Sequence, residues 1–239
     1  MKEVYKDLWN IFYKDGTYIM RWPDEPTIRF FGRLSKKMDL KGKKGLDVGC
    51  GVGRNLWLMY EFGIEPYGIE ISKEAVKKAI EFSKQKFPSA KITLYDGHKI
   101  PFEKDFFDFV ISHGVLDHMT LNEAKLLIDE IYRVLKPFGY LCLVVHSIYD
   151  SEYGKGKKIE ENTFIIEERD YEVGLPQHYF TFDELKNLLN KFKIEQLYRH
   201  EEILLDNGGN PTNKSSYWVV YAKKVKNNDL SYNSSSSRR

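Results

Sequence analysis

In the stretch GLDVGCGVGRN, residues 45–55, a short apolar run passes directly into three glycines at alternate positions. A strand that leads through a glycine-rich turn into a helix is how an open α/β sheet brings backbone N–H groups against a ligand. The dinucleotide fingerprint G-x-G-x-x-G, read from Gly49, would require glycine at position 54, where this chain has Arg54. The phosphate-binding pattern G-x-x-x-x-G-K-[ST] does not occur in the sequence. The loop therefore indicates a ligand other than a dinucleotide or a bare pyrophosphate.

Around this loop, apolar runs rich in β-branched and aromatic residues alternate with segments of helical period. This alternation predicts a parallel sheet covered by helices. We expect seven strands, at residues 45–48, 66–71, 91–95, 107–112, 140–145, 193–198 and 217–223. We expect helices at 54–62, 72–86 and 120–135 and a further one after 181. The last two follow the capping boxes TLNE and TFDE, which are typical of helix starts.

The length and composition predict one sizeable α/β domain with appendages, since the chain has 239 residues of which 42% are hydrophobic. Its 37 basic and 35 acidic side chains are interleaved and give a formal net charge of +2. These interleaved charges create no domain-scale electrostatic field of the kind that holds nucleic acid or an anionic membrane. We therefore expect neither as a partner.

Two cysteines, Cys50 and Cys142, fall inside apolar stretches, and no spaced set suggests a disulfide framework. The amino-terminal sequence MKEVYKDLWN mixes acids with bases and has no continuous apolar segment. The longest aliphatic run, residues 141–145, is far too short to span a bilayer. We expect a soluble protein of the cytoplasm.

The stretch LDVGCGVGRN resembles the first motif of class I S-adenosylmethionine-dependent methyltransferases, and four further matches follow it in the family's order. They are YGIEIS, YDGHKIPF, FFDFVISHGVLDHM and RVLKPFGYL, the last with Phe138 where the family usually has a glycine. Together the matches cover residues 45–146. The resemblance implies a Rossmann-like, doubly wound sheet of seven strands, mostly parallel with an antiparallel last strand, and helices on both faces.

The resemblance also implies a cofactor site for S-adenosyl-L-methionine, with S-adenosyl-L-homocysteine as the product. Glu70 would hold the ribose hydroxyls, Asp96 the adenine amino group, and Asp47 the glycine loop. Asn55 would either cap the helix locally or touch the ligand. The complete implied set is Arg21, Asp47, Gly49, Cys50, Gly51, Asn55, Glu70, Ile71, Asp96, Gly97, His98 and His113.

Methyl transfer requires alignment, a sheltered site, and a base where the acceptor carries a proton. Three histidines are candidates on the same rim: His113 after the fourth strand, His146 after the fifth, and His178 in the long segment between residues 147 and 179. We predict His178 as a substrate-side residue and general base, and His113 as a neighbour of the cofactor. We expect His118 to be structural. A metal held by three histidines is the weaker alternative, because the acidic ligands of the metal-dependent branch are not found.

Residues 147–179 fit neither the helical nor the strand period, and a connection of that length is usually a lid or a binding loop. The strings ENTF and GLPQHYFT resemble a subgroup associated with glycan or small-metabolite modification. The aromatic-rich amino-terminal segment is either a helix packed on the core or a cover over the cofactor pocket, in which Arg21 could pair with the cofactor carboxylate. We expect a cover segment at 1–40, the catalytic domain at 41–225 with a substrate lid at 147–179, and a disordered tail at 226–239.

The sequence thus predicts a methyltransferase that acts on an oxygen or nitrogen of a small soluble acceptor, including the sugar or glycan precursor class. Two alternatives stay open. One is a non-catalytic protein that binds S-adenosylmethionine, because a fold and a cofactor site do not guarantee chemistry. The other, disfavoured by Arg54, is a nicotinamide-dependent oxidoreductase.

Overall fold

The structure is a computed structural model that describes residues 3–16, 18–168 and 171–225. The tail predicted at 226–239 lies outside the described residues.

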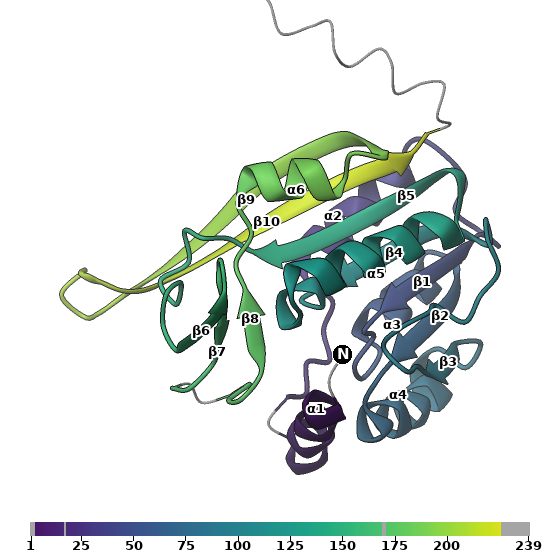
Figure 1. Cartoon of the computed structure of the whole chain (residues 1–239). Coiled ribbons are helices and arrows are strands. Elements are labelled where there is room, and N and C mark those ends of the chain that lie inside the picture. The colour runs from purple at the N-terminus through teal and green to yellow at the C-terminus, as the bar shows by residue number, and fades with distance from the viewer. Residues whose placement is uncertain (1–2, 17, 169–170, 226–239) are drawn as a thin grey trace, which may run out of the picture.

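Seven strands form the central sheet in the order β3-β2-β1-β4-β5-β10-β9 (Figure 1). Their bounds are β1 Lys44–Val48, β2 Glu65–Glu70, β3 Lys91–Leu94, β4 Phe107–His113, β5 Leu135–His146, β9 Phe192–Leu205 and β10 Pro211–Lys224. Strand β10 is antiparallel to both β5 and β9, and the other neighbours run parallel. The expected mostly parallel sheet with an antiparallel last strand is confirmed.

Helices cover both faces of this sheet, as Figure 1 shows with α5 in front of the strands and α2 behind them. The helices are α1 Glu3–Asp15, α2 Glu25–Leu34, α3 Arg54–Glu61, α4 Lys73–Lys86, α5 Leu121–Val134 and α6 Phe182–Leu188, with one 3₁₀ turn, η1 Leu116–His118. Apolar residues of α5 and α6 pack in one buried cluster, and those of α2 and α3 pack in the cluster on the opposite face. Both predicted capping boxes are present, at Thr120 with Glu123 and at Thr181 with Glu184.

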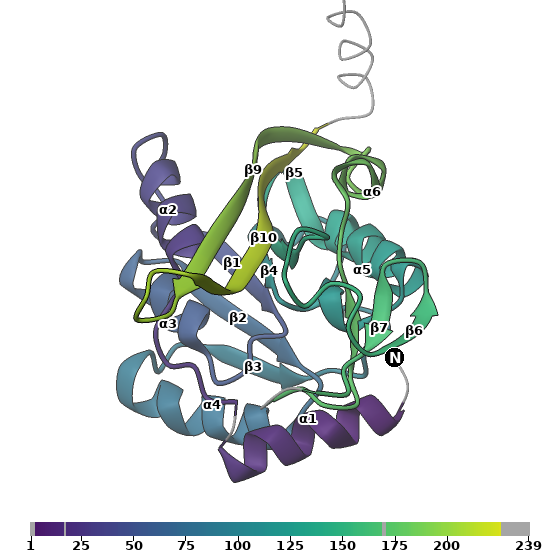
Figure 2. The same cartoon turned by 90° about the vertical axis from the view of Figure 1, so that its left-hand side faces the viewer.

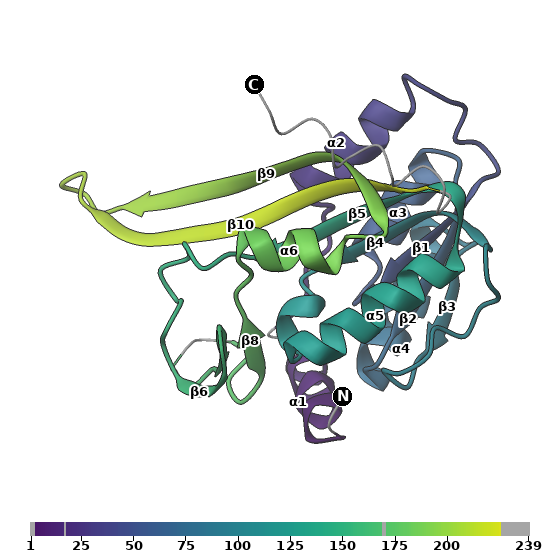
Figure 3. The ribbon, with the colours of Figure 1, turned by 45° about the horizontal axis from the view of Figure 1, so that its top comes forward.

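The last two strands are much longer than the predicted segments 193–198 and 217–223, and that prediction was wrong in extent. Their hairpin projects beyond the rest of the molecule (Figure 3). In the projecting part of β9 both charged and apolar side chains are exposed, among them Ile203 and Leu205. Because neither face of the hairpin is buried there, the sequence has no alternation that would reveal a strand.

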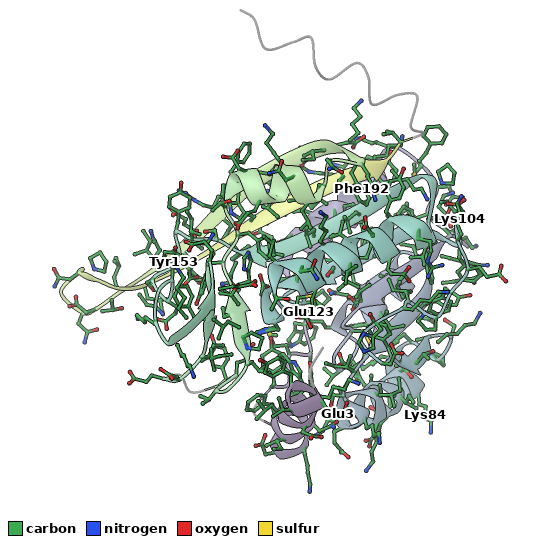
Figure 4. The ribbon with its side chains drawn as sticks, viewed as in Figure 1. Glu3, Lys84, Lys104, Glu123, Tyr153 and Phe192 are labelled. Atoms are coloured by element: carbon green, nitrogen blue, oxygen red, sulfur yellow. The ribbon has the colours of Figure 1, made fainter. Side chains whose placement is uncertain are left out.

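The segment 147–179 contains a second sheet, which was not predicted from the sequence. Its three antiparallel strands are β6 Lys157–Glu160, β7 Thr163–Ile165 and β8 Pro176–His178. Tyr153, just before this sheet, lies on the opposite side of the molecule from Lys84 and Lys104 (Figure 4). Helix α1 lies beside α4, below the sheet (Figure 2). The small sheet and α1 therefore flank the edge at which the parallel strands end.

Candidate active site

A cavity of about 560 Å³ lies at the carboxyl ends of the parallel strands. Its walls come from the loop after β1, the ends of β2, β4 and β5, and the start of η1. Trp9 and Tyr13 of α1 cover it, together with Tyr18 and Met20 of the following loop. This is where an open α/β sheet places its ligands.

The glycine loop forms one wall. The N–H groups of Gly49 and Cys50 both donate to the carbonyl oxygen of Ile69, at 2.8 and 3.1 Å, which ties the loop to the end of β2. Gly49 has a φ of +69°, and a Cβ added there would lie 2.5 Å from Cγ2 of Val115. Both the backbone conformation and the close neighbour therefore require glycine at this position.

The Glu70 carboxylate lies at the end of β2 and is nearly fully buried. It accepts hydrogen bonds from the backbone N–H groups of Ile71 at 2.8 Å, Ser72 at 2.9 Å and Gly51 at 3.0 Å. Burial raises the pKa of Glu70, and these three bonds act against the rise. A carboxylate has about four lone-pair sites, so Glu70 keeps capacity for one further donor.

Asp47, at the end of β1, faces the same wall and has one carboxylate oxygen, Oδ2, without a hydrogen-bond partner among the described residues. Burial raises the pKa of Asp47 to about 8, while Arg54 and the amide of Asn55 act to lower it. An unsatisfied buried carboxylate oxygen beside a cavity is a fitting partner for the ammonium group of a ligand.

His113 and Asp24 meet on a second wall. The Nδ1 atom of His113 lies 2.7 Å from Oδ2 of Asp24, and Nη2 of Arg54 lies 3.4 Å from the same oxygen. Asp24 is held in place because it also caps α2 by accepting from the backbone N–H of Thr27. Burial acts to raise the pKa of Asp24, but the hydrogen bond and charge of His113, with Arg54, hold it well below its usual range.

His146 and Asp150 form a similar pair at the end of β5, with Nδ1 and Oδ2 3.3 Å apart. The backbone N–H of His146 donates to Oδ1 of Asp117 at 2.7 Å. Asp117 is fully buried, and its Oδ2 atom has no hydrogen-bond partner among the described residues. The carboxyl ends of β4 and β5 are thus joined through one aspartate on the cavity wall.

His118 also lines the cavity, although its contacts fit the structural role expected for it. Its Nδ1 atom lies 3.1 Å from the carbonyl oxygen of Pro176, its Nε2 atom lies 3.4 Å from Glu172, and its ring meets that of Trp9 edge to face. Burial acts to lower the pKa of His118, but the charge of Glu172 raises it overall. His118 therefore links the cover helix to the segment 147–179.

The structure brings most of the predicted site residues together. Those that line the cavity are Asp47, Gly49, Cys50, Gly51, Asn55, Glu70, Ile71, Gly97, His113 and His146. Burial raises the pKa of the Cys50 thiol, which agrees with a packing role. Their roles toward a ligand stay predictions.

Four predicted residues lie elsewhere. Arg21, Asp96 and His98 are exposed and are not among the lining residues, and the Asp96 carboxylate accepts from the backbone N–H of His98 at 2.8 Å. His178 is fully buried outside the cavity wall, with Nδ1 2.6 Å from Oγ1 of Thr163. This position does not support His178 as a general base, so we transfer that role to residues that reach the cavity.

Sequence reasoning missed Asp24, Asp117, Glu172 and Tyr217, all of which line the cavity. Asp24 carried a usable signal, because an aspartate followed by Glu-Pro is typical of a helix start and would have placed the helix correctly. The other three acquire their surroundings only through tertiary contacts. Among the described residues, no group of three or more histidine, cysteine, aspartate or glutamate side chains is arranged to hold a metal ion.

No helix in the described ranges is long and apolar enough to cross a membrane.

Comparison with known proteins gives consistent results. Residues 46–143 match a family model described as a methyltransferase domain. A tRNA N(3)-methylcytidine methyltransferase of Drosophila melanogaster is 23% identical over 180 residues, 70% of this chain and 52% of that protein. Phosphoethanolamine N-methyltransferase 2 of Caenorhabditis elegans is 25% identical over 199 residues, 80% of this chain and 43% of that protein.

Solved structures resemble the fold as well. A crystal structure of a SAM-dependent methyltransferase from Methanosarcina mazei has 26% identity and a TM-score of 0.66, and covers 81% of this chain and 97% of its own. In contrast, this chain spans only about half the length of the first two curated relatives.

Proposed function

Because the chain belongs to the class I S-adenosylmethionine-dependent methyltransferases, we propose that it transfers a methyl group to an oxygen or nitrogen of a small soluble acceptor bound in this cavity. The observation that carries the proposal is the pairing of His113 with Asp24 and of His146 with Asp150 on the walls beyond the glycine loop. A histidine oriented by a carboxylate is the usual arrangement of a general base.

The residues present fit the methyl donor. In our proposal the loop at Gly49 and Gly51 lies against its methionine portion, Asp47 pairs with its ammonium group, and Glu70 accepts from its ribose. The donor supplies a methyl carbon already activated by the positive sulfur. What remains for the chain is to align the acceptor, exclude water and accept a proton.

Residues 1–40 and 147–179 support the enclosure that such a reaction needs. Trp9, Tyr13 and Tyr18 cover the cavity from the amino-terminal side, and Tyr171 and Glu172 reach it from the long segment. We propose that the first is the cover segment and the second the substrate lid of the domain at 41–225. A cavity of about 560 Å³ favours a small acceptor, since a nucleic acid would also require a basic surface beside the site.

A labelled-methyl transfer assay tests this function. Purified full-length protein is incubated with methyl-labelled S-adenosylmethionine and either a metabolite pool that includes sugar nucleotides or a tRNA pool. We expect label in the small-molecule products and, for His146→Gln, a rate about 10² to 10⁴-fold lower, the range typical of lost acid–base catalysis. Asp129→Asn, a change at an exposed residue paired with Lys191 on the outer surface of α5, is the control and should behave as wild type.

Label found only in the tRNA pool would contradict the small-molecule proposal. A wild-type rate for His146→Gln would remove His146 as the base.

A further inference from the structure

The charged side chains on the cavity wall are mostly acidic. Among the described lining residues, Arg54 carries a guanidinium group and no lysine is present. The carboxylates are those of Asp24, Asp47, Glu70, Asp117 and Glu172. An anionic acceptor such as a phosphate or carboxylate would therefore approach several like charges, and the one guanidinium group already lies 3.4 Å from Asp24.

Most of these carboxylates already have a partner. Asp24 pairs with His113 and Arg54, and Glu172 lies 3.4 Å from Nε2 of His118. Glu70 accepts three backbone hydrogen bonds, and Asp47 lies beside the glycine loop, where the proposed function places the donor's ammonium group.

Asp117, beyond the glycine loop where the acceptor would bind, differs from these carboxylates because one of its oxygens has no such partner among the described residues. One oxygen, Oδ1, accepts from the backbone N–H of His146, which fixes the carboxylate at the end of β5. The other, Oδ2, is buried, lies on the cavity wall and has no hydrogen-bond partner among the described residues. A Cβ added at Gly114 would be 4.0 Å from this oxygen, so the glycine leaves space beside it in the loop after β4.

A buried carboxylate oxygen is costly to leave without a donor, and a charged donor compensates it better than a neutral one. A hydroxyl group would offer one neutral hydrogen bond. A protonated amine offers both a hydrogen bond and the opposite charge. Burial raises the pKa of Asp117, while the charges of His146 and His118 act to lower it, and an ammonium group beside it would favour the ionised form.

We propose that Asp117 binds an amino group of the acceptor and that the reaction is N-methylation of a small amine. This inference rests on the proposed function. The ammonium group held by Asp117 gives one proton to His146, the base of the proposed function, and the nitrogen lone pair then forms the N–C bond to the donor methyl carbon. The C–S bond breaks with its electron pair on sulfur, and the product leaves as a methylated ammonium ion. The positive charge of the sulfonium is thereby lost while one proton rests on His146.

Calorimetric titration of the full-length protein saturated with S-adenosylhomocysteine tests the inference. The probes are primary alkylamines and arylalkylamines, each matched with the alcohol of the same carbon skeleton. We expect amines to bind about 10- to 100-fold more tightly than their alcohols, as a charge-assisted hydrogen bond to a buried carboxylate predicts. Asp117→Asn should abolish this preference, because the amide can still accept from His146 through Oδ1 but has no charge.

Two controls keep the outcomes distinct. Affinity for S-adenosylhomocysteine should be unchanged in Asp117→Asn, which shows that the variant is folded, and Asp129→Asn should keep the amine preference. Alcohols that bind as tightly as amines, or an amine preference that survives in Asp117→Asn, would overturn the inference.

The labelled-methyl assay separates this inference from the proposed function. The metabolite pool is divided, and the amines of one half are blocked by acylation before use. We expect transfer only in the untreated half. Equal transfer in both halves would overturn the amine assignment and leave the proposed function intact. Transfer in neither half would contradict the proposed function, and the titration would then decide whether Asp117 recognises amines.

Discussion

The side chains that give this cavity its chemistry are fixed by contacts outside it. Asp24 is held by its cap of α2, Glu70 by three backbone N–H groups, and Asp117 by the N–H of His146. Each carboxylate therefore points in one direction without help from a ligand. Such preorganisation lowers the cost of aligning two reactants.

We predict that Asp47 makes the affinity for the cofactor product depend on pH. Because burial raises its pKa to about 8, a large share of this carboxyl is protonated at pH 6. A ligand ammonium group favours the ionised form, so binding releases a proton below pH 8. The affinity for S-adenosylhomocysteine should rise from pH 6 to about pH 8, by at most about tenfold per pH unit, and then level off.

Calorimetry at pH 6, 7 and 8 measures this dependence. Asp47→Asn cannot ionise, and its affinity should vary much less over the same range. An equally steep profile in the variant would show that another group carries the dependence, and a flat wild-type profile would show that Asp47 does not face the ammonium group.

The glycine loop is closely packed on two sides. Gly49 lies against Val115, and a Cβ at Gly51 would be 2.7 Å from the hydroxyl of Tyr13 on the cover helix. The loop thus contacts both the wall after β4 and the cover. Any added side chain would alter the cavity as well as the backbone.

Gly49→Ala and Gly42→Ala separate these two effects. Both glycines have φ near +70°, but a Cβ at Gly42 would meet nothing within 4 Å. Both variants should lose about 1 to 2 kcal/mol of stability from the backbone alone, measured by chemical denaturation. Gly49→Ala should in addition bind S-adenosylhomocysteine at least about tenfold more weakly, because Val115 must move into the cavity. Equal affinities in the two variants would show that the Gly49 backbone does not approach the ligand.

The regular elements could be predicted where burial leaves a pattern. The central strands are buried on both faces and appear as apolar runs, and α5 shows both its capping box and its apolar stripe. The strands β6 to β8 are three or four residues long, too short for a period to be recognised. The outer part of β9 has no buried face at all. These are the elements that the sequence did not reveal.

The site was predictable to the extent that local motifs carry it. Gly49 and Glu70 follow strands in recognisable strings, and both line the cavity. His178 appeared equally suitable in sequence, but β8 turns its ring into the small sheet against Thr163. Asp117 could not be recognised as a site residue from the sequence, because the N–H group that orients its carboxylate comes from β5, 29 residues away.

The molecule as a whole is a doubly wound sheet with two chain segments beside the edge at which the cavity lies, one before the first strand and one after the fifth. Helix α1 comes before the first strand, and the small sheet of β6 to β8 is inserted after the fifth (Figures 1 and 2). His118 contacts both, through Trp9 and Glu172. His118, on the cavity wall, therefore connects the two segments that lie beside the cavity.

Calorimetric titration of the full-length protein with S-adenosylhomocysteine, and separately with NAD, identifies which cofactor the cavity binds. We predict that S-adenosylhomocysteine binds with one-to-one stoichiometry, that NAD does not bind, and that Glu70→Ala weakens the binding by about 1 to 3 kcal/mol through loss of a buried hydrogen-bonding group. Binding of NAD without binding of S-adenosylhomocysteine would contradict the account.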